Sequence, residues 1–522
     1  MLNLSINKKN LPNLFFWILI IVNSYPIVFN QYFLTLDGPA HLYNAKLVLQ
    51  VLFEKNELLN YFYDFNTYPE PNLTGHVLME LLLTVFPPWL SEKTIQLIYI
   101  FGFPLSFYYF LKGLNKDLGF KYIYFFPFIY AFTFVIGFYN YCLSLILFFI
   151  CLSLWNSYLK NQTSNRIFAL ALCLLLLYFS HALVFLFCVL TITTVSISWS
   201  ISNPIPKWYK SIFLKIALVS WPGLILIVSF LFNKRDVNEV YFIPFNELVK
   251  WVYTLKPVVA YGKIEVILTT ILFVIYLISA IAKLIHRVKT ESFRINFKSD
   301  SYLLLFLVFG VLIFVIPDKL ASGGYVTMRL IMFTFFFLTI WICAQTQKNW
   351  IDTCSLIIIL GIVSALNFRH FNGYAITNKE IKEQQSCLSH IKPNSTLLPL
   401  NYSKHWLQSN MSNYLGTEFP LFILDNYEAS HKPFQLHWKK NRNPYELVGS
   451  FAGHPPLCAN ISNFETVTQK SIDYIMTWKM PPNLNDSCTN SLRHNITNDY
   501  DTVFVSHSKK LVLFEKRVIS QF

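Results

Sequence analysis

LFFWILIIVNSYPIVFNQYFLTLDGPAHLYN, residues 14–44, joins an apolar run directly to a polar segment. The run 14–34 is long enough to cross a hydrocarbon core about 30 Å thick. No small-residue cleavage site follows it, so we interpret it as a first membrane span and not as a cleaved signal peptide. The polar segment then places Asp37 and His41 four residues apart, just outside that span.

The rest of the chain repeats this apolar character. Of its 522 residues, 54% are hydrophobic and only 13% are charged, whereas soluble domains carry about 25% charged residues. The composition and the recurring apolar runs predict a polytopic α-helical membrane protein with 11–13 transmembrane helices. We expect spans at 14–34, 73–90, 94–111, 121–137, 139–158, 166–181, 183–200, 211–232, 264–285, 301–316, 325–344 and 351–367, of which 73–90, with two prolines, dips into the membrane and returns.

The basic residues fall largely in short loops between the apolar runs. The net charge is +14, and the most basic loop is 283–298. The positive-inside bias explains this pattern with no nucleic-acid partner. It predicts a cytoplasmic N-terminus and an extracytoplasmic C-terminal part. Abundant Asn, Lys, Ile and Phe indicate an AT-rich genome, so we expect a bacterial inner membrane.

The composition changes after the last apolar run. We interpret 1–367 as a transmembrane domain with a first external loop at 35–72, and 368–522 as a soluble extracytoplasmic α/β domain. In this tail, the patterns predict a helix, turn and buried strand in 380–400, a strand at 471–478 and a hairpin at 500–516. Its three cysteines allow one disulfide, and the spacing leaves the pair open among Cys387, Cys458 and Cys488. No CxxC or HExxH motif occurs, so we expect no closed zinc site.

The segment TLDGPAHLYN (35–44) has two interpretations. Pro39 suits the first turn of a helix and Asp37 its N-cap, with His41 and Asn44 following on the same face. In the first, Asp37 only caps and His41 only makes a hydrogen bond nearby. In both, we expect the amphipathic helix 41–53 to lie along the membrane surface. The alternative is a reactive acid, because Asp37 stands at the outer mouth of the first span.

A second polar cluster follows in FNTYPEPNLTGHVLMELLL (65–83). Glu70 precedes a helix on which His76 and Glu80 are one turn apart. These groups either anchor the helix at the interface or converge with Asp37 and His41. Converging carboxylates and imidazoles could act as general base and acid, or hold a divalent cation such as Mg²⁺ or Mn²⁺ through Asp37, Glu70 and His76.

Further polar groups stand at breaks between spans. Asn140 and His181 each lie at such a break, and Arg329 lies about one turn inside an apolar run. An arginine there binds a phosphate bidentately or extends to the membrane surface. Asp318, in the preceding loop, is a possible partner for it.

Three motifs carry a resemblance to a known family: LDGPAH (36–41), YPEPNLTGH (68–76) and GGYVTMRL (323–330). Together with the order of spans and tail, the chain resembles the GT-C superfamily of membrane glycosyltransferases. That superfamily includes protein mannosyltransferases, the aminoarabinose transferase of lipid A and oligosaccharyltransferases. The resemblance implies a polyprenyl-phosphate sugar as donor, a glycan, lipid or protein as acceptor, and reaction at the external membrane face.

The resemblance also implies roles for single residues. Asp37 corresponds to the first-loop acid, and Arg329 to a basic group that holds the lipid phosphate. Many members have two adjacent acids, whereas here Asp37 is followed by Gly38, so Glu70 or Glu80 would supply the second. The residues that we assign to catalysis are Asp37, His41 and Glu70, and those that we assign to substrate binding are His76, Glu80, Asn140, His181 and Arg329.

Two other functions fit the same residues. One is a transporter or flippase of a lipid-linked substrate, and the other is a non-catalytic scaffold with the same architecture. A transporter favours polar groups at mid-membrane depth and repeated halves. Here the polar groups gather toward one face, which favours the glycosyltransferase.

Overall fold

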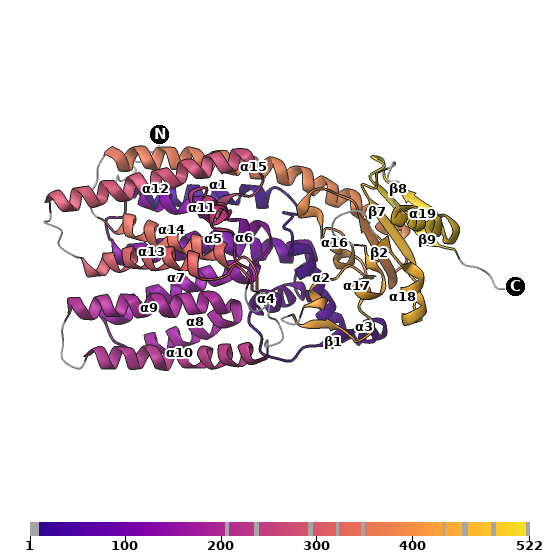
Figure 1. Cartoon of the computed structure of the whole chain (residues 1–522), viewed down its shortest axis with the longest axis horizontal. Helices are drawn as coiled ribbons and strands as arrows, with labels where there is room; N and C mark the ends of the chain where they lie inside the picture. Colours follow the sequence, from indigo (N-terminus) through magenta and orange to yellow (C-terminus); the bar gives the residue numbers. More distant parts are fainter. Residues whose placement is uncertain are drawn as a thin grey trace, which may run out of the picture. The chain divides into compact units, whose positions relative to one another are not determined.

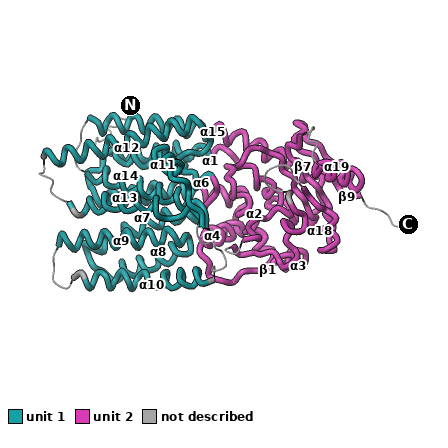
Figure 2. The backbone as a smooth tube through the Cα atoms, viewed as in Figure 1, with its two compact units in different colours: residues 1–26, 97–135, 140–371 teal, residues 27–96, 136–139, 372–522 magenta. Residues whose placement is uncertain are grey.

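The structure is a computed structural model of the chain, and it describes residues 10–203, 208–233, 240–290, 296–319, 323–345, 350–431, 434–451, 458–481 and 487–517. The chain divides into two compact units (Figure 2). Unit 1 holds residues 1–26, 97–135 and 140–371, and unit 2 holds 27–96, 136–139 and 372–522. The predicted domain boundary at 367/368 stays a prediction.

The chain is an integral membrane protein with long apolar helices, and most of their length lies in unit 1. Figure 1 shows these helices side by side. Among the described residues, nine helices are long and apolar enough to cross a membrane. They are α1 (Leu11–Val28), α5 (Pro88–Leu114), α7 (Tyr139–Lys160), α9 (Ala182–Ser202), α10 (Trp208–Asn233), α12 (Lys263–Thr290), α13 (Phe297–Val315), α14 (Val326–Ala344) and α15 (Trp350–Gln385).

Two further predicted spans form shorter helices. The segment 73–90 gives α4 (Thr74–Leu83) and the start of α5, and 166–181 gives α8 (Ser164–Ser180). The predicted span 121–137 is wrong as a membrane helix. It forms the 3₁₀ helix η2 (Lys121–Phe128) and the single turn α6 (Phe132–Val135). Every residue of η2 is buried, so its aromatic side chains serve the protein interior.

Helix α14 lies at the centre of unit 1. All of its residues from Val326 to Cys343 are buried, and it packs against α13, α12 and η2. The amphipathic helix α11 (Phe245–Tyr253) and the 3₁₀ turn η3 (Lys256–Val258) connect α10 to α12. A helix that is apolar all round is expected at the middle of such a bundle.

Unit 2 is an α/β structure around a five-stranded sheet with the order β3-β2-β7-β9-β8. β2 is parallel to both β3 and β7, while β9 is antiparallel to β7 and β8. All seven residues of β2 are buried, as expected for the middle of a parallel set. The strands are β2 (Ser395–Asn401), β3 (Leu421–Ile423), β7 (Tyr474–Trp478), β8 (Tyr500–Val505) and β9 (Leu511–Lys516).

These strands confirm the α/β character predicted for the tail. The helix, turn and strand of 380–400, the strand at 471–478 and the hairpin at 500–516 are all present. The disulfide joins Cys458 to Cys488, and Cys387 is a buried free thiol. The smaller elements of the tail are η4 (Leu388–His390), η5 (Trp406–Gln408), α16 (Asn413–Glu418), η6 (Glu428–Ser430), β4 (Leu436–Trp438), α17 (Pro444–Leu447), β5 (Gly449–Ser450), β6 (Cys458–Ala459), α18 (Ile461–Thr468) and α19 (Ser487–Asp499).

The first loop is part of the same unit as the tail. It forms α2 (Gly38–Leu49), the π-helical turn η1 (Gln50–Glu54), α3 (Glu57–Phe62) and β1 (Tyr63–Phe65). β1 pairs antiparallel with β4, in the register Tyr63 to Trp438. The two segments therefore share a small sheet although they lie far apart in sequence.

The expected amphipathic helix on the membrane surface is wrong. Ten of the twelve residues of α2 are buried, and α2 packs against α4, α16 and η6. The hydroxyl of Tyr43 donates to Leu421 O (3.1 Å) and accepts from Ile423 N–H (2.9 Å), both at β3. The polar side chains of α2 therefore contact other parts of the protein. The pattern of polar and apolar residues along a helix does not show whether its polar side faces water or protein.

Candidate active site

Asp37 stands at the N-cap position of α2 without capping it. Its carboxylate makes no cap hydrogen bond. Instead the hydroxyl of Thr35 accepts the N–H of Gly38 at 3.1 Å, and Pro39 needs no partner in the first turn. The backbone N–H of Asp37 donates to Ile136 O at 3.0 Å. The segment is thus fixed by its backbone, and the carboxylate remains available for another role.

The surroundings of the Asp37 carboxylate favour its neutral form. The side chain is half-buried and receives a hydrogen bond from Asn410 Nδ2 at 3.3 Å. Burial raises the pKa of Asp37 to about 6, against the charge of His41 and a hydrogen bond from Tyr427, which lower it. A carboxylate with a pKa near 6 is a better base than an ordinary aspartate.

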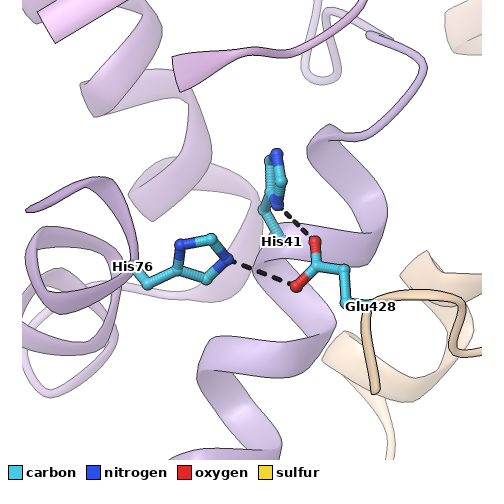
Figure 3. A group of neighbouring side chains, drawn as sticks. All are labelled: His41, His76 and Glu428. Atoms are coloured by element: carbon cyan, nitrogen blue, oxygen red, sulfur yellow. Dashed lines mark hydrogen bonds and ion pairs between the residues drawn. The ribbon is translucent and has the colours of Figure 1, made fainter. Parts of the chain in front are cut away.

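His41, His76 and Glu428 converge in the interior of unit 2 (Figure 3). His41 lies in the first turn of α2, His76 in the first turn of α4 and Glu428 at the start of η6. The Nδ1 of His41 contacts Glu428 Oε1, and the Nε2 of His76 lies 3.2 Å from Glu428 Oε2. The imidazole rings are 4.9 Å apart at 82°. All three side chains are buried.

The carboxylate of Glu428 holds a negative charge in this interior. Burial opposes that charge, but the two imidazoles outweigh burial and lower the pKa of Glu428 to about 2. For His41, burial lowers the pKa, and the charge and hydrogen bond of Glu428 outweigh it, so the pKa of His41 is raised. His41 and Glu428 therefore form a buried ion pair.

Asn44 orients the Glu428 carboxylate, and Asn426 supports Asn44 in turn. Asn44, one turn after His41 on α2, donates to Glu428 Oε2 at 2.6 Å and to Asn426 Oδ1 at 2.9 Å. Asn426 in turn donates to the hydroxyl of Tyr63 on β1 (3.2 Å). The first loop and the tail thus hold the same carboxylate from both sides.

A second buried carboxylate, Glu92, lies beside the start of α2. It accepts hydrogen bonds of 2.6 Å from the hydroxyls of both Tyr139 and Tyr414. Gln96 also donates to Tyr139 OH, at 2.8 Å. A Cβ added at Gly38 would collide with Glu92 Oε1 and Tyr139 OH. Close packing of this group against Gly38 explains why the residue after Asp37 has no side chain.

Glu70 and Glu80 lie in the same unit. Glu70 is buried in the loop between β1 and α4, with its N–H donating to Tyr68 O at 2.7 Å. Glu80 is one turn beyond His76 and accepts a hydrogen bond from Gln435, and burial raises its pKa to about 7. The hydrogen bonds and ion pairs described above link neither acid directly to the His41–Glu428 pair.

The other predicted binding residues belong to unit 1. Arg329 is buried, donates from Nη1 to Gly324 O (2.9 Å) and lies over the ring of Tyr141 at 5.3 Å. His181 stands between α8 and α9, with its ring 5.3 Å from the same tyrosine. Asn140 is buried in the first turn of α7. Arg329 and His181 therefore both pack against the ring of Tyr141. Asn140 is the residue that precedes Tyr141 in the chain.

Asp318, the partner suggested for Arg329, lies in the loop before α14. Its Oδ1 accepts the N–H of Thr327 at 2.9 Å and its carbonyl accepts the N–H of Val326. Asp318 therefore satisfies two N–H groups of the first turn of α14 from the preceding loop, while the N-cap position itself is held by Tyr325.

The sequence interpretation missed Glu428. It lies in ILDNYE (423–428), where β3 ends in a run of buried polar residues. Parallel strands place functional groups just beyond their carboxyl ends, so an acid five residues after a buried strand was an available signal. The sequence analysis did not predict a strand at β3. Glu428 was therefore not recognised as an acid that follows a buried strand.

Comparisons with known proteins find likenesses among solved structures. No family model and no curated protein matches the chain. Among solved structures, it is similar to the crystal structure of ArnT from Cupriavidus metallidurans bound to undecaprenyl phosphate, with a TM-score of 0.45 and 11% sequence identity. The match covers 98% of this chain and 99% of that chain. Likeness at this level transfers no function from one protein to the other.

Proposed function

We propose that this membrane protein is a glycosyltransferase that moves a sugar from a polyprenyl-phosphate donor to a hydroxyl of an envelope glycan, lipid or protein. One observation carries the proposal. The Asp37 carboxylate is half-buried, leaves the cap of its helix to Thr35, and lies beside the buried His41–Glu428 pair. A carboxylate that the fold does not use as a cap, with a pKa near 6, suits a general base.

The reaction is a displacement at the anomeric carbon of the donor sugar. The acceptor oxygen forms a bond to that carbon while its proton passes to the Asp37 carboxylate. The bond from the carbon to the phosphate oxygen breaks, and the electron pair leaves with the polyprenyl phosphate. Because phosphate is a good leaving group, the step needs no strong acid. The charges of His41 and Glu428, which both act on Asp37, provide a fixed electrostatic environment for the proton transfer.

The remaining assignments are proposed on the chemistry of each side chain. Arg329 is the ligand for the donor phosphate, because a guanidinium presents several N–H donors in one plane. Asn140 and His181 are assigned to the donor in the same unit. Glu70 is the proposed second acid, and His76 and Glu80 are assigned to the acceptor side of unit 2.

We place the reaction at the extracytoplasmic face of a bacterial inner membrane, with the N-terminus cytoplasmic. The disulfide between Cys458 and Cys488 supports this orientation for the tail, because disulfides persist in oxidising compartments and are rare in the cytosol. The basic loop 283–298, which joins the spans 264–285 and 301–316, is expected to lie on the cytoplasmic side.

The test is sugar transfer by the purified full chain in lipid, with a panel of polyprenyl-phosphate sugars and mixed envelope acceptors. We expect Asp37→Asn to lose at least roughly 100-fold in rate, the usual contribution of a general base. Asp64→Asn is the matched control, since this acid belongs to the same loop but its side chain is 66% exposed.

Two outcomes contradict the proposal in different ways. Equal transfer by wild type and Asp37→Asn would show that Asp37 is not the base. If wild type binds polyprenyl-phosphate sugars but yields no product with any acceptor, the protein is a scaffold or a transporter.

A further inference from the structure

One group of side chains among the described residues is placed to share a metal ion. The ligand atoms of His41, His76 and Glu428 all lie within 4.8 Å of one another, and all three residues are buried. Figure 3 shows each imidazole facing one oxygen of the Glu428 carboxylate. We infer that these residues form a zinc site with one coordination position left for an oxygen ligand.

The donor atoms select the metal. Two imidazole nitrogens and one carboxylate oxygen are the ligand set of open, three-residue zinc sites. Mg²⁺ prefers oxygen ligands alone and keeps several waters, so the Mg²⁺ or Mn²⁺ expected from the sequence fits this group less well. A tetrahedral ion with bonds of about 2.0–2.1 Å separates its ligand atoms by roughly 3.4 Å. The separation of 3.2 Å between His76 Nε2 and Glu428 Oε2 is near that value, and all three ligand atoms lie within 4.8 Å of one another.

The carboxylate already has a supporting hydrogen bond. Asn44 donates to Glu428 Oε2 at 2.6 Å, which leaves the other oxygen directed at His41. Zinc ligands are usually oriented by such outer partners. His41 and Asn44 are on the same helix, so α2 supplies one ligand and the group that orients another.

The local charge favours a dication. The carboxylates of Glu428, Asp37 and Glu92 act electrostatically on His41. A divalent cation would take the place of the proton that His41 carries in its ion pair with Glu428, with both imidazoles neutral as metal ligands.

The ion would join the first loop to the tail within unit 2. Its ligands come from α2 in the first loop, from α4 just after that loop, and from η6 in the tail. The fourth position would take a water or a substrate oxygen, such as that of a hydroxyl or a phosphate. The site is independent of the proposed sugar transfer, because it depends only on the three ligands.

The experiment measures metal content without any sugar substrate. The full chain is purified in lipid, stripped with a chelator, reloaded with zinc alone and analysed by elemental mass spectrometry. We expect about one zinc per chain in wild type, and an at least roughly tenfold loss in His41→Ala, His76→Ala and Glu428→Gln. The controls His494→Ala, an exposed histidine of α19, and Glu92→Gln, a buried carboxylate outside the group, should keep the metal.

Two further measurements keep the test decisive if a ligand variant fails to fold. X-ray absorption of the loaded wild type should show nitrogen and oxygen ligands and no sulfur. Asn44→Ala, which keeps all three ligands, should weaken zinc binding by roughly 10- to 100-fold. A wild-type protein that binds no stoichiometric zinc, or ligand variants that keep it, would overturn the inference.

The results also separate this inference from the proposed function. Zinc at one per chain with no sugar transfer would reject the glycosyltransferase and keep the metal site. Sugar transfer that continues in a chain shown to bind no zinc would reject the metal site and keep the glycosyltransferase.

Discussion

Gly38 is the residue whose replacement tests the packing around Asp37. Its position is closed by Glu92 and Tyr139, so the added methyl of Gly38→Ala would force one of them to move. Overpacking of this kind costs about 1–3 kcal/mol. We therefore expect a lower free energy of unfolding in Gly38→Ala, together with a loss of transfer rate. Denaturant unfolding of the purified protein measures the first effect.

Gly373 provides the control for that change. It is a helical glycine of α15 in the same unit, and an added Cβ meets nothing within 4 Å. Gly373→Ala should be neutral or stabilise by about 0.5–1 kcal/mol, because alanine favours a helix. Equal losses in both variants would show that the contact with Glu92 is not the cause.

The titration of Asp37 predicts a pH dependence. Its pKa is raised to about 6 in the folded protein, from an ordinary value of about 3.9. The folded state then binds the proton more tightly, so this group favours folding below about pH 4, and that contribution is lost as the pH rises to about 6. Base catalysis follows the opposite course, because only the deprotonated carboxylate accepts a proton.

We therefore expect the transfer rate to rise with pH and to level off above about pH 6. The measurement is kcat/KM across pH 4.5–8, with wild type and Asp37→Asn compared. The variant should lose this rise. A rise that persists in Asp37→Asn would assign the titration to another group.

The candidate site could be predicted in part from single residues. The i,i+4 spacing of Asp37 and His41, and the start of an apolar helix at His76, were sufficient to select both imidazoles. Glu428 was out of reach because its partners are more than 350 residues away. A local pattern contains no information on such a pairing. The local signal for Glu428 was its place five residues after a buried strand, and that strand was not predicted.

At the scale of elements, Tyr43 tests how α2 is held to the tail sheet. Its hydroxyl bonds to the backbone of Leu421 and Ile423 on β3. Tyr43→Phe leaves two buried backbone groups without these bonds, which costs about 1–3 kcal/mol. We expect that loss in denaturant unfolding. Tyr253→Phe, at a ring that is 42% exposed, should stay within about 0.5 kcal/mol of wild type. A Tyr43→Phe variant as stable as this control would contradict the role of the hydroxyl.

Most of the long apolar runs predicted their helices, and one of similar length did not. α7, α9, α12, α13 and α14 follow the expected spans closely. The segment 121–137 has the same apolar composition, but protein surrounds it instead of lipid, and it contains Pro127 within a 3₁₀ helix. Hydropathy measures how apolar a segment is and not what surrounds it. For the same reason the prediction of α2 as a membrane-surface helix was wrong, because its polar residues face the tail.

For the whole molecule, the disulfide predicts the compartment of the tail. It closes a loop of 30 residues between Cys458 and Cys488, and such a cross-link typically stabilises by 2–4 kcal/mol. In intact cells, a membrane-impermeant maleimide should label these cysteines only after reduction. Labelling without a reductant would place free thiols outside. No labelling after reduction, with labelling after lysis, would place the tail in the cytosol.

The pairing of the first loop with the tail also determines when the protein is finished. Tyr43 and its partner Leu421 are 378 residues apart. A ribosome that adds about 5–20 residues per second reaches the partner roughly 20 to 75 s after the loop is made. During that interval, α2 has neither β3 nor η6 to cover it, and His41 has no Glu428. The nascent chain therefore lacks the His41–Glu428 pair until the tail is made, and the uncovered loop is the part that a chaperone or a protease would meet first.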